Sequence, residues 1–167
     1  MEREVMGKHQ TKRQAIVIFG KLVLVAAGLC CKSTLANETA TLKVVNWNVL
    51  YGFNHQNSVE KGVDWIKKQA ADVVALQELN GHSESGLKKL ASAWGHPYSV
   101  ILKEQGFPVG LTSSQPIEVI KRQVEGFHHG YLHCKTQGIH FFVVHFWPGK
   151  YREVDEILDR IAPLLRQ

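Results

Sequence analysis

The chain has 167 residues, a length that predicts one domain, and it contains no internal repeat or low-complexity linker. Its formal net charge of +5 arises mainly in residues 1–36, where six basic side chains outnumber two acidic ones. Residues 37–167 carry 14 Lys and Arg and 13 Asp and Glu, so the basic isoelectric point gives no argument for nucleic-acid binding. The same range has a single cysteine, Cys134, which excludes an internal disulfide.

Residues 1–36 have the parts of a secretory signal peptide. Basic residues precede an uncharged run at 22–31, and Thr34 and Ala36 occupy the −3 and −1 positions of a cleavage site before Asn37. The alternative is an uncleaved membrane anchor, but a membrane span needs about 20 apolar residues and Lys21 interrupts the apolar stretch. We therefore expect a signal peptide at 1–36, a domain at 37–167 exported to the periplasm or the cell exterior, and no stable membrane span.

Apolar periodicity predicts the secondary structure of the exported domain. Runs typical of strands lie at 42–49, 72–79, 98–102, 109–112, 117–124, 131–135 and 139–144, and a Gly- and Asn-containing loop is expected at 51–57. Helical spacing predicts helices at 58–70, 85–94 and 152–165, with Ser58 as an N-cap and Pro163 disturbing the last turn. Strands and helices alternate early and strands dominate later, which predicts a layered α/β fold with mixed sheets.

Polar side chains end three of the predicted strands. Asn48, in Trp47-Asn48-Val49, can accept and donate hydrogen bonds and so contact a metal-bound water and a phosphate oxygen, although a turn role explains an isolated Asn. Glu78 follows a buried strand at a sheet edge, where a carboxylate suits Mg²⁺ or simply marks the exposed strand end. His145 could donate a hydrogen bond to a phosphate oxygen or stabilise developing charge, or it could be a structural histidine.

Together, these motifs resemble those of the endonuclease/exonuclease/phosphatase superfamily. The resemblance covers residues 42–165. It consists of a strand ending in Trp47-Asn48, the segment DVVALQE at 72–78, the segment GFPVGLTSSQPI at 106–117 and a strand ending in His145. The order of all four is the specific feature. The fold it implies is α/β of the α+β type, the deoxyribonuclease-I-like four-layer β-sandwich flanked by helices.

The resemblance also implies a reaction and a role for each residue. Members of the superfamily hydrolyse phosphate esters with Mg²⁺ or Mn²⁺, which polarises the phosphoryl group while an activated water attacks in line. Glu78 would bind the metal, Asn48 would support the metal and phosphate site, and His145 would contact phosphate or stabilise the transition state. The substrate stays open among nucleic acids, phosphoinositides, sphingomyelin and small phosphate esters.

The family pattern continues with residues that this sequence does not supply. These are a Gly-Asp-x-Asn motif, a later Asp and a terminal Asp-His pair that generates the nucleophile, whereas here His145 is the last histidine. Asp155 and Asp159 lie four residues apart within a predicted helix, which is typical of its solvated face. We therefore expect a truncated domain, incomplete at its C-terminus, with little or no hydrolase activity alone.

Two other interpretations do not require hydrolysis. One is a histidine-rich zinc-binding module built from His128, His129, His133, Cys134 and His140. Neighbours on a strand point to opposite faces, which argues against a site that uses both His133 and Cys134. The other is a non-catalytic remnant that binds a partner through an open sheet edge and self-associates with concentration.

Overall fold

The computed structural model describes residues 41–147 and 151–166, so the predicted signal peptide and its cleavage site lie outside the described residues. The strands are β1 (Val44–Asn48), β2 (Val73–Gln77), β3 (Tyr98–Ile101), β4 (Val109–Ser113), β5 (Glu118–Gln123), β6 (Tyr131–Thr136) and β7 (Ile139–Val144). The helices are α1 (Val59–Gln69), α2 (Glu84–Ala93) and α3 (Tyr151–Ile161), which continues as the 3₁₀ turn η2 (Ala162–Arg166).

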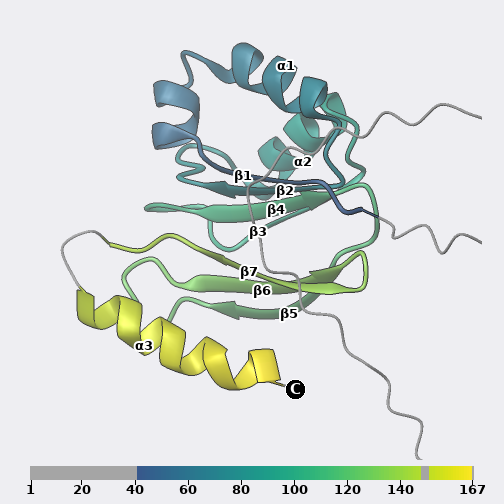
Figure 1. The fold of residues 1–167 in the computed structure, drawn as a ribbon. Coiled ribbons are helices and arrows are strands. Elements are labelled where there is room, and N and C mark those ends of the chain that lie inside the picture. Colours follow the sequence, from purple (N-terminus) through teal and green to yellow (C-terminus); the bar gives the residue numbers. More distant parts are fainter. Residues whose placement is uncertain (1–40, 148–150, 167) are drawn as a thin grey trace, which may run out of the picture. The chain divides into compact units, whose positions relative to one another are not determined.

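Two sheets carry the fold (Figure 1). The first has the order β1-β2-β4-β3, in which β1 and β2 are parallel and β4 is antiparallel to both of its neighbours. The second is an antiparallel sheet, β5-β6-β7. The helix α1 makes the crossover between β1 and β2. Because these two strands are parallel, their carboxyl ends meet at one edge of the sheet, where Asn48 pairs with Gln77.

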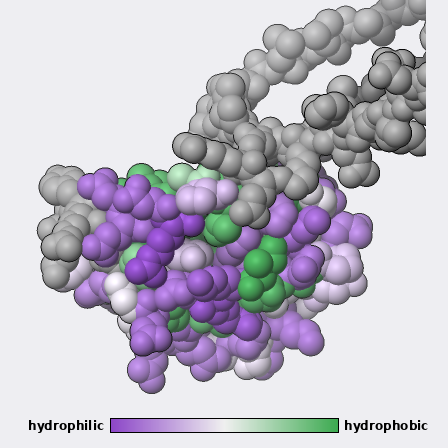
Figure 2. Space-filling model, turned by 90° about the horizontal axis from the view of Figure 1, so that it is seen from below, coloured by the Kyte–Doolittle hydropathy of each residue, from purple (hydrophilic) through white to green (hydrophobic). Residues whose placement is uncertain are grey.

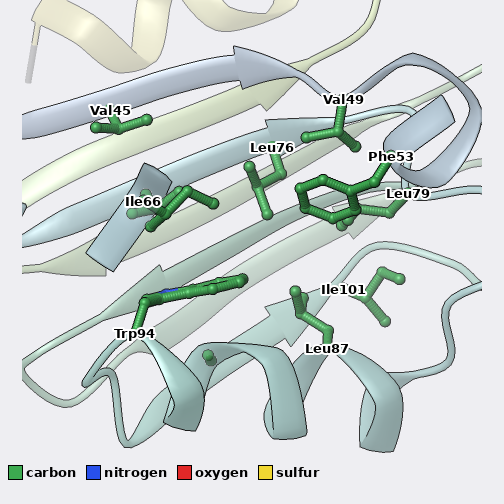
Figure 3. Packing of buried hydrophobic residues seen from close by; sticks show 11 residues of the cluster. Val45, Val49, Phe53, Ile66, Leu76, Leu79, Leu87, Trp94 and Ile101 are labelled. Atoms are coloured by element: carbon green, nitrogen blue, oxygen red, sulfur yellow. The ribbon is translucent and has the colours of Figure 1, made fainter. Parts of the chain in front are cut away.

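The fold has four layers: the helices α1 and α2, the four-stranded sheet, the three-stranded sheet and the helix α3. Three hydrophobic clusters join them. The first lies between the helices α1 and α2 and the outer face of the four-stranded sheet, and includes Phe53, Leu76 and Leu87 (Figure 3). The second lies between the two sheets and includes Leu111 and Cys134. In the third, residues of α3 pack on the outer face of the three-stranded sheet. The predicted four-layer α+β sandwich is therefore confirmed.

The connection from β1 to α1 has an unusual backbone. All seven residues at 50–56, of which only Gly52 is a glycine, have φ between 47° and 70° and form a left-handed turn that includes η1 (Leu50–Asn54). A left-handed helical conformation costs roughly 1–2 kcal/mol for each non-glycine residue, so packing must hold it. Phe53 does so: it is 2% exposed, and its ring lies against Gly62 of α1, where a Cβ atom would approach it to 2.4 Å.

The predicted elements all occur, and most differences are shifts of one or two residues at the ends. Pro163 lies in η2, so the α-helix ends at Ile161 as its proline predicts. The N-cap prediction is wrong in its chemistry, because Ser58 precedes α1 without a capping hydrogen bond from its side chain. Instead, the backbone N–H of Ser58 donates to the Phe53 carbonyl oxygen of the left-handed turn.

The surface on the side of α3 is mostly hydrophilic, with smaller hydrophobic patches (Figure 2). Asp155 and Asp159 are exposed there, as the sequence predicts for a solvated helix face. Within residues 41–147 and 151–166, no helix has the length and apolar character needed to cross a membrane.

Candidate functional site

Glu78 lies directly after β2 and is held from two sides. Its Oε1 accepts a hydrogen bond of 2.8 Å from Asn48 Nδ2, and its Oε2 accepts one of 2.9 Å from the backbone N–H of Tyr51. Its backbone carbonyl also accepts a hydrogen bond of 2.7 Å from the N–H of Gly52. Glu78 itself has a left-handed φ of 59°, a strained conformation that is typical of functional positions. The strand end and the left-handed turn thus fix both the backbone and the carboxylate.

The carboxylate of Glu78 is stabilised in its ionised form. Partial burial raises its pKa, but the hydrogen bonds from Asn48 and Tyr51 and the nearby imidazoles of His145 and His129 outweigh burial, so that the pKa lies below its ordinary value. The side chain is only 12% exposed. The site therefore presents a shielded negative charge with a fixed orientation at neutral pH.

Asn48 uses both ends of its amide. Its Oδ1 accepts a hydrogen bond of 2.9 Å from the N–H of Leu50 while its Nδ2 donates to Glu78. Because a backbone N–H can only donate, it fixes Oδ1 toward Leu50 and Nδ2 toward the carboxylate. Asn48 thus closes the turn, the role that explains an isolated Asn, and it also orients Glu78, whereas its contact with a metal-bound water or a phosphate oxygen stays a prediction.

His145 reaches the same carboxylate from the other sheet. It follows β7, and its Nε2 lies 3.7 Å from Glu78 Oε1. Burial lowers the pKa of His145, and the neighbouring carboxylate of Glu78 only partly offsets this effect. The imidazole is therefore largely neutral at pH 7, and its contact with Glu78 is a polar contact rather than a full ion pair. The structure brings together all three residues that the motifs single out, Asn48, Glu78 and His145.

Three further residues complete the site, and the sequence does not assign them to it. Tyr51 contributes a backbone N–H, which no side-chain motif reveals. His129 is 2% exposed, and its ring centroid lies 4.8 Å from that of His145. Phe107 stacks on His145 with centroids 5.8 Å apart and an interplanar angle of 21°. The GFP segment at 106–108 and the adjacent histidines at 128–129 are visible in the sequence, but only the packing of the two sheets joins them to His145.

The residues of the zinc-binding interpretation do not form one site. His133 is paired with His140 at 2.9 Å between their ring nitrogens and stacks on Phe142, whereas Cys134 is buried between the sheets. The opposite orientation of His133 and Cys134 is the one that strand alternation predicts. His128 and His129 are not extended, and their Nδ1 atoms lie 3.2 Å apart.

Within the described ranges, no group of three or more His, Cys, Asp and Glu residues is placed to hold a metal ion by itself. The open edge that the remnant interpretation requires is present in the same part of the chain, since β1 pairs there only with β2.

No protein-family model matches the sequence, but solved structures match the fold. D. rerio TDP2 complexed with single-strand DNA product gives a TM-score of 0.55 at 16% identity, over 75% of this chain and 55% of that one. An AP endonuclease from Archaeoglobus fulgidus gives 0.54 at 15% identity, over 74% and 49%. A humanized D. rerio TDP2 with 14 mutations gives 0.50 at 15% identity, over 72% and 56%.

These similarities confirm the fold that the motifs predict. The described part of the chain has the deoxyribonuclease-I-like fold, which is the fold of the endonuclease/exonuclease/phosphatase superfamily. The chain spans about half the length of the solved structures that it matches, between 49% and 56%. At 15–16% identity the similarity concerns the fold, so the roles of individual residues depend on the geometry of the site.

Proposed function

We propose that this chain carries the metal- and phosphate-binding residues of a divalent-metal-dependent phosphoesterase. The observation that supports this proposal is the arrangement of Glu78, whose carboxylate is held by Asn48 and the Tyr51 N–H and faced by His145. Two sheets contribute to this arrangement, and each of the three side chains follows or ends a strand. The combination of a fixed carboxylate and a neutral imidazole suits binding and polarisation of a phosphate ester.

The donor set fits Mg²⁺ or Mn²⁺. Such ions are commonly bound through one or two carboxylates and keep several waters and substrate phosphate oxygens as further ligands. Each oxygen of Glu78 accepts one hydrogen bond from the protein, so each keeps a lone pair that could bind a cation. When bound, the ion would polarise the phosphoryl group and lower the pKa of a bound water.

The protein groups would divide the remaining tasks. Glu78 would hold the cation, and Asn48 would keep the carboxylate in one orientation. His145, neutral because burial lowers its pKa, could donate a hydrogen bond from a ring N–H to a non-bridging phosphate oxygen. His129 and Phe107 would limit the motion of the His145 ring through direct packing.

The class of substrate is proposed from the sequence and from the matching structures. The substrate is a phosphate ester, and nucleic acid is one candidate, since two of the matching structures are of TDP2 and one is of an AP endonuclease. The nearly balanced charge of residues 37–167 does not favour a nucleic-acid polymer.

We further propose that the domain is exported through residues 1–36. We also propose that the chain alone hydrolyses esters slowly or not at all, because the nucleophile-generating Asp-His pair of the family pattern is absent from its sequence.

Metal binding tests the proposal without requiring turnover. The full chain would be titrated with Mn²⁺ and followed by electron paramagnetic resonance, with Mg²⁺ as a competitor. We expect one Mn²⁺ site that Mg²⁺ displaces and that Glu78→Gln weakens at least 10-fold, because the substitution removes the carboxylate charge. Asp64→Asn, at an exposed position on α1, is the matched control and should bind as the wild type does. Equal binding by Glu78→Gln and the wild type would refute the proposal.

A further inference from the structure

A continuous row of aromatic rings includes two residues that contact the carboxylate of Glu78, namely His145 through its ring and Tyr51 through its backbone N–H. Ring contacts with centroid separations of 3.9 to 5.8 Å link seven side chains in the order His55, Tyr51, Phe107, His145, His129, His128 and Trp147. Four of the six separations lie within about 4.5–7 Å, the range of favourable aromatic pairs, and the two contacts of His128 are closer, at 4.4 and 3.9 Å. The left-handed turn supplies the first two rings, and the three-stranded sheet and its loops supply the last four. Phe107 lies between the two groups.

The middle of the row is buried, whereas both ends reach the surface: at the far end His128 is exposed and Trp147 is partly exposed. His129 is 2% exposed, so the middle of the row is part of the interior. Tyr51, in contrast, is 41% exposed, and its ring is stacked on the exposed His55 with an interplanar angle of 12°. The residues that present this open end are the ones in left-handed conformation, and the N–H of Tyr51 is bonded to Glu78. A strained turn therefore holds exposed aromatic surface at a fixed position beside the candidate phosphate site.

We propose that the exposed end of this row that adjoins Glu78, Tyr51 with His55, is a stacking subsite for a planar aromatic group carried by the substrate, and that the substrate is a small phosphate ester of the nucleotide type. The inference rests on the proposed function, since it places the phosphate at Glu78 and His145. Bases stack on aromatic side chains whatever their sequence, because every base has a π-face. A nucleic-acid polymer would also need several Lys or Arg side chains along its phosphate backbone. The balanced charge of residues 37–167 does not favour binding of such a polymer.

Matched ligands separate the phosphate from the base. Binding of AMP, ribose 5-phosphate and adenosine to the full chain would be measured by isothermal titration calorimetry in the presence of Mg²⁺. AMP and ribose 5-phosphate carry the same phosphate on the same sugar and differ only in the base. We expect AMP to bind about 5- to 150-fold more tightly than ribose 5-phosphate, the range that one base–aromatic stack supplies.

Variants of Tyr51 locate the effect. Tyr51→Leu should remove most of the preference for AMP, whereas Tyr51→Phe should retain it, because stacking requires the ring and not the hydroxyl group. The backbone N–H that holds Glu78 is present in both variants. Tyr98→Leu is the matched control, since Tyr98 on β3 is comparably exposed at 40% and should leave the preference unchanged.

The possible failures can be told apart. If ribose 5-phosphate binds and AMP binds no more tightly, the stacking subsite is refuted while the phosphate site stands. A preference for AMP that persists in Tyr51→Leu would also refute it. If neither phosphate compound binds but adenosine does, and this depends on Tyr51, the subsite stands and the proposed function fails. Absence of binding by all three compounds contradicts both.

Discussion

Two strand-to-helix connections leave the same edge of the four-stranded sheet, and they are built differently. The connection from β1 to α1 is a left-handed turn at 50–56, and Ser58 before α1 makes no side-chain cap. The connection from β2 to α2 has a conventional helix start, in which Ser83 Oγ accepts a hydrogen bond of 3.1 Å from the N–H of Gly86. Both connections start at a polar residue of the site, Asn48 and Glu78 respectively.

The difference lies in what the backbone groups of each connection bind. In the first connection, the N–H groups of Tyr51 and Gly52 donate to Glu78, which belongs to the second. The left-handed conformation turns these groups toward the carboxylate at a cost in backbone energy. A local helix cap stabilises its own helix, whereas this turn stabilises a charged group elsewhere in the chain. The first connection therefore stabilises the carboxylate of the candidate site rather than capping its own helix.

The largest expected effect comes from Gly52→Ala. A Cβ atom at Gly52 would lie 2.0 Å from the carbonyl oxygen of Asn80, a backbone atom that cannot easily move. We expect a loss of about 3 kcal/mol or more in the free energy of unfolding, measured by urea denaturation, because steric conflict adds to left-handed strain. Gly81→Ala is the control from the second connection. It also has a positive φ, of 77°, but its Cβ would meet only the flexible Gln56 side chain at 3.2 Å, so we expect about 1 kcal/mol. Equal losses would show that the close approach has no special importance.

Asn48→Ala should have the next largest effect, because it removes a hydrogen bond to a shielded carboxylate. We expect a loss of about 1–3 kcal/mol in stability and a rise in the pKa of Glu78, followed by NMR titration of its side-chain carboxyl carbon. Asn46→Ala provides the comparison, since Asn46 accepts a hydrogen bond from Gln77 Nε2 on the same sheet without contacting Glu78. An unchanged pKa of Glu78 in Asn48→Ala would contradict the role of Asn48.

Acid pH should weaken the contact between the two connections. His82, in the second, is 8% exposed and lies beside Gly52 and Gln56 of the first; burial lowers its pKa, and a hydrogen bond with the Gly52 backbone only partly opposes this. The folded state then binds fewer protons than the unfolded state, so stability is complete above the ordinary histidine pKa of about 6.5 and falls as pH decreases below it. The urea midpoint should be lower at pH 5 than at pH 7.5, and His82→Leu should reduce this difference. An identical pH dependence in the variant would assign the effect to other histidines, such as His133, whose pKa burial also lowers.

The smallest effects concern the helix starts. Ser83→Ala should cost about 1 kcal/mol, and Ser58→Ala less than about 0.5 kcal/mol, because only Ser83 caps its helix through the side chain. Thermal unfolding of the two variants measures the difference. A larger loss in Ser58→Ala would mean that Ser58 caps α1 in solution and that the two connections are alike.

Most of the fold could be predicted from the sequence, because the apolar periods of the strands and helices are strong. The positions of Asn48, Glu78 and His145 at strand ends could be predicted as well, and the parallel pairing of β1 with β2 brings the first two to one edge. The left-handed turn could not, because residues 50–56 contain one glycine and would each prefer an ordinary conformation in isolation. Only tertiary contacts, such as burial of Phe53 and the N–H bonds to Glu78, impose it.

The other missed features depend on the packing of the sheets. His129 lies 16 residues before His145 in the sequence, and no local pattern predicts that their rings meet. Ser58 does occupy the N-cap position of α1, but its side chain makes no capping hydrogen bond, for a related reason. The preceding turn already positions the chain and provides the acceptor for its backbone N–H, so the serine side chain is not needed there.

The position of Cys134 makes the junction between the sheets accessible to kinetic measurement. Its side chain is 0% exposed, and burial raises the pKa of the thiol to about 12, with the charge of Arg122 opposing this only in part. Alkylating reagents react with the thiolate, so this cysteine is protected both by burial and by protonation. Within residues 37–167 it is the sole thiol. The rate at which maleimide modifies the domain would then report how often the two sheets separate, under native conditions and without denaturant.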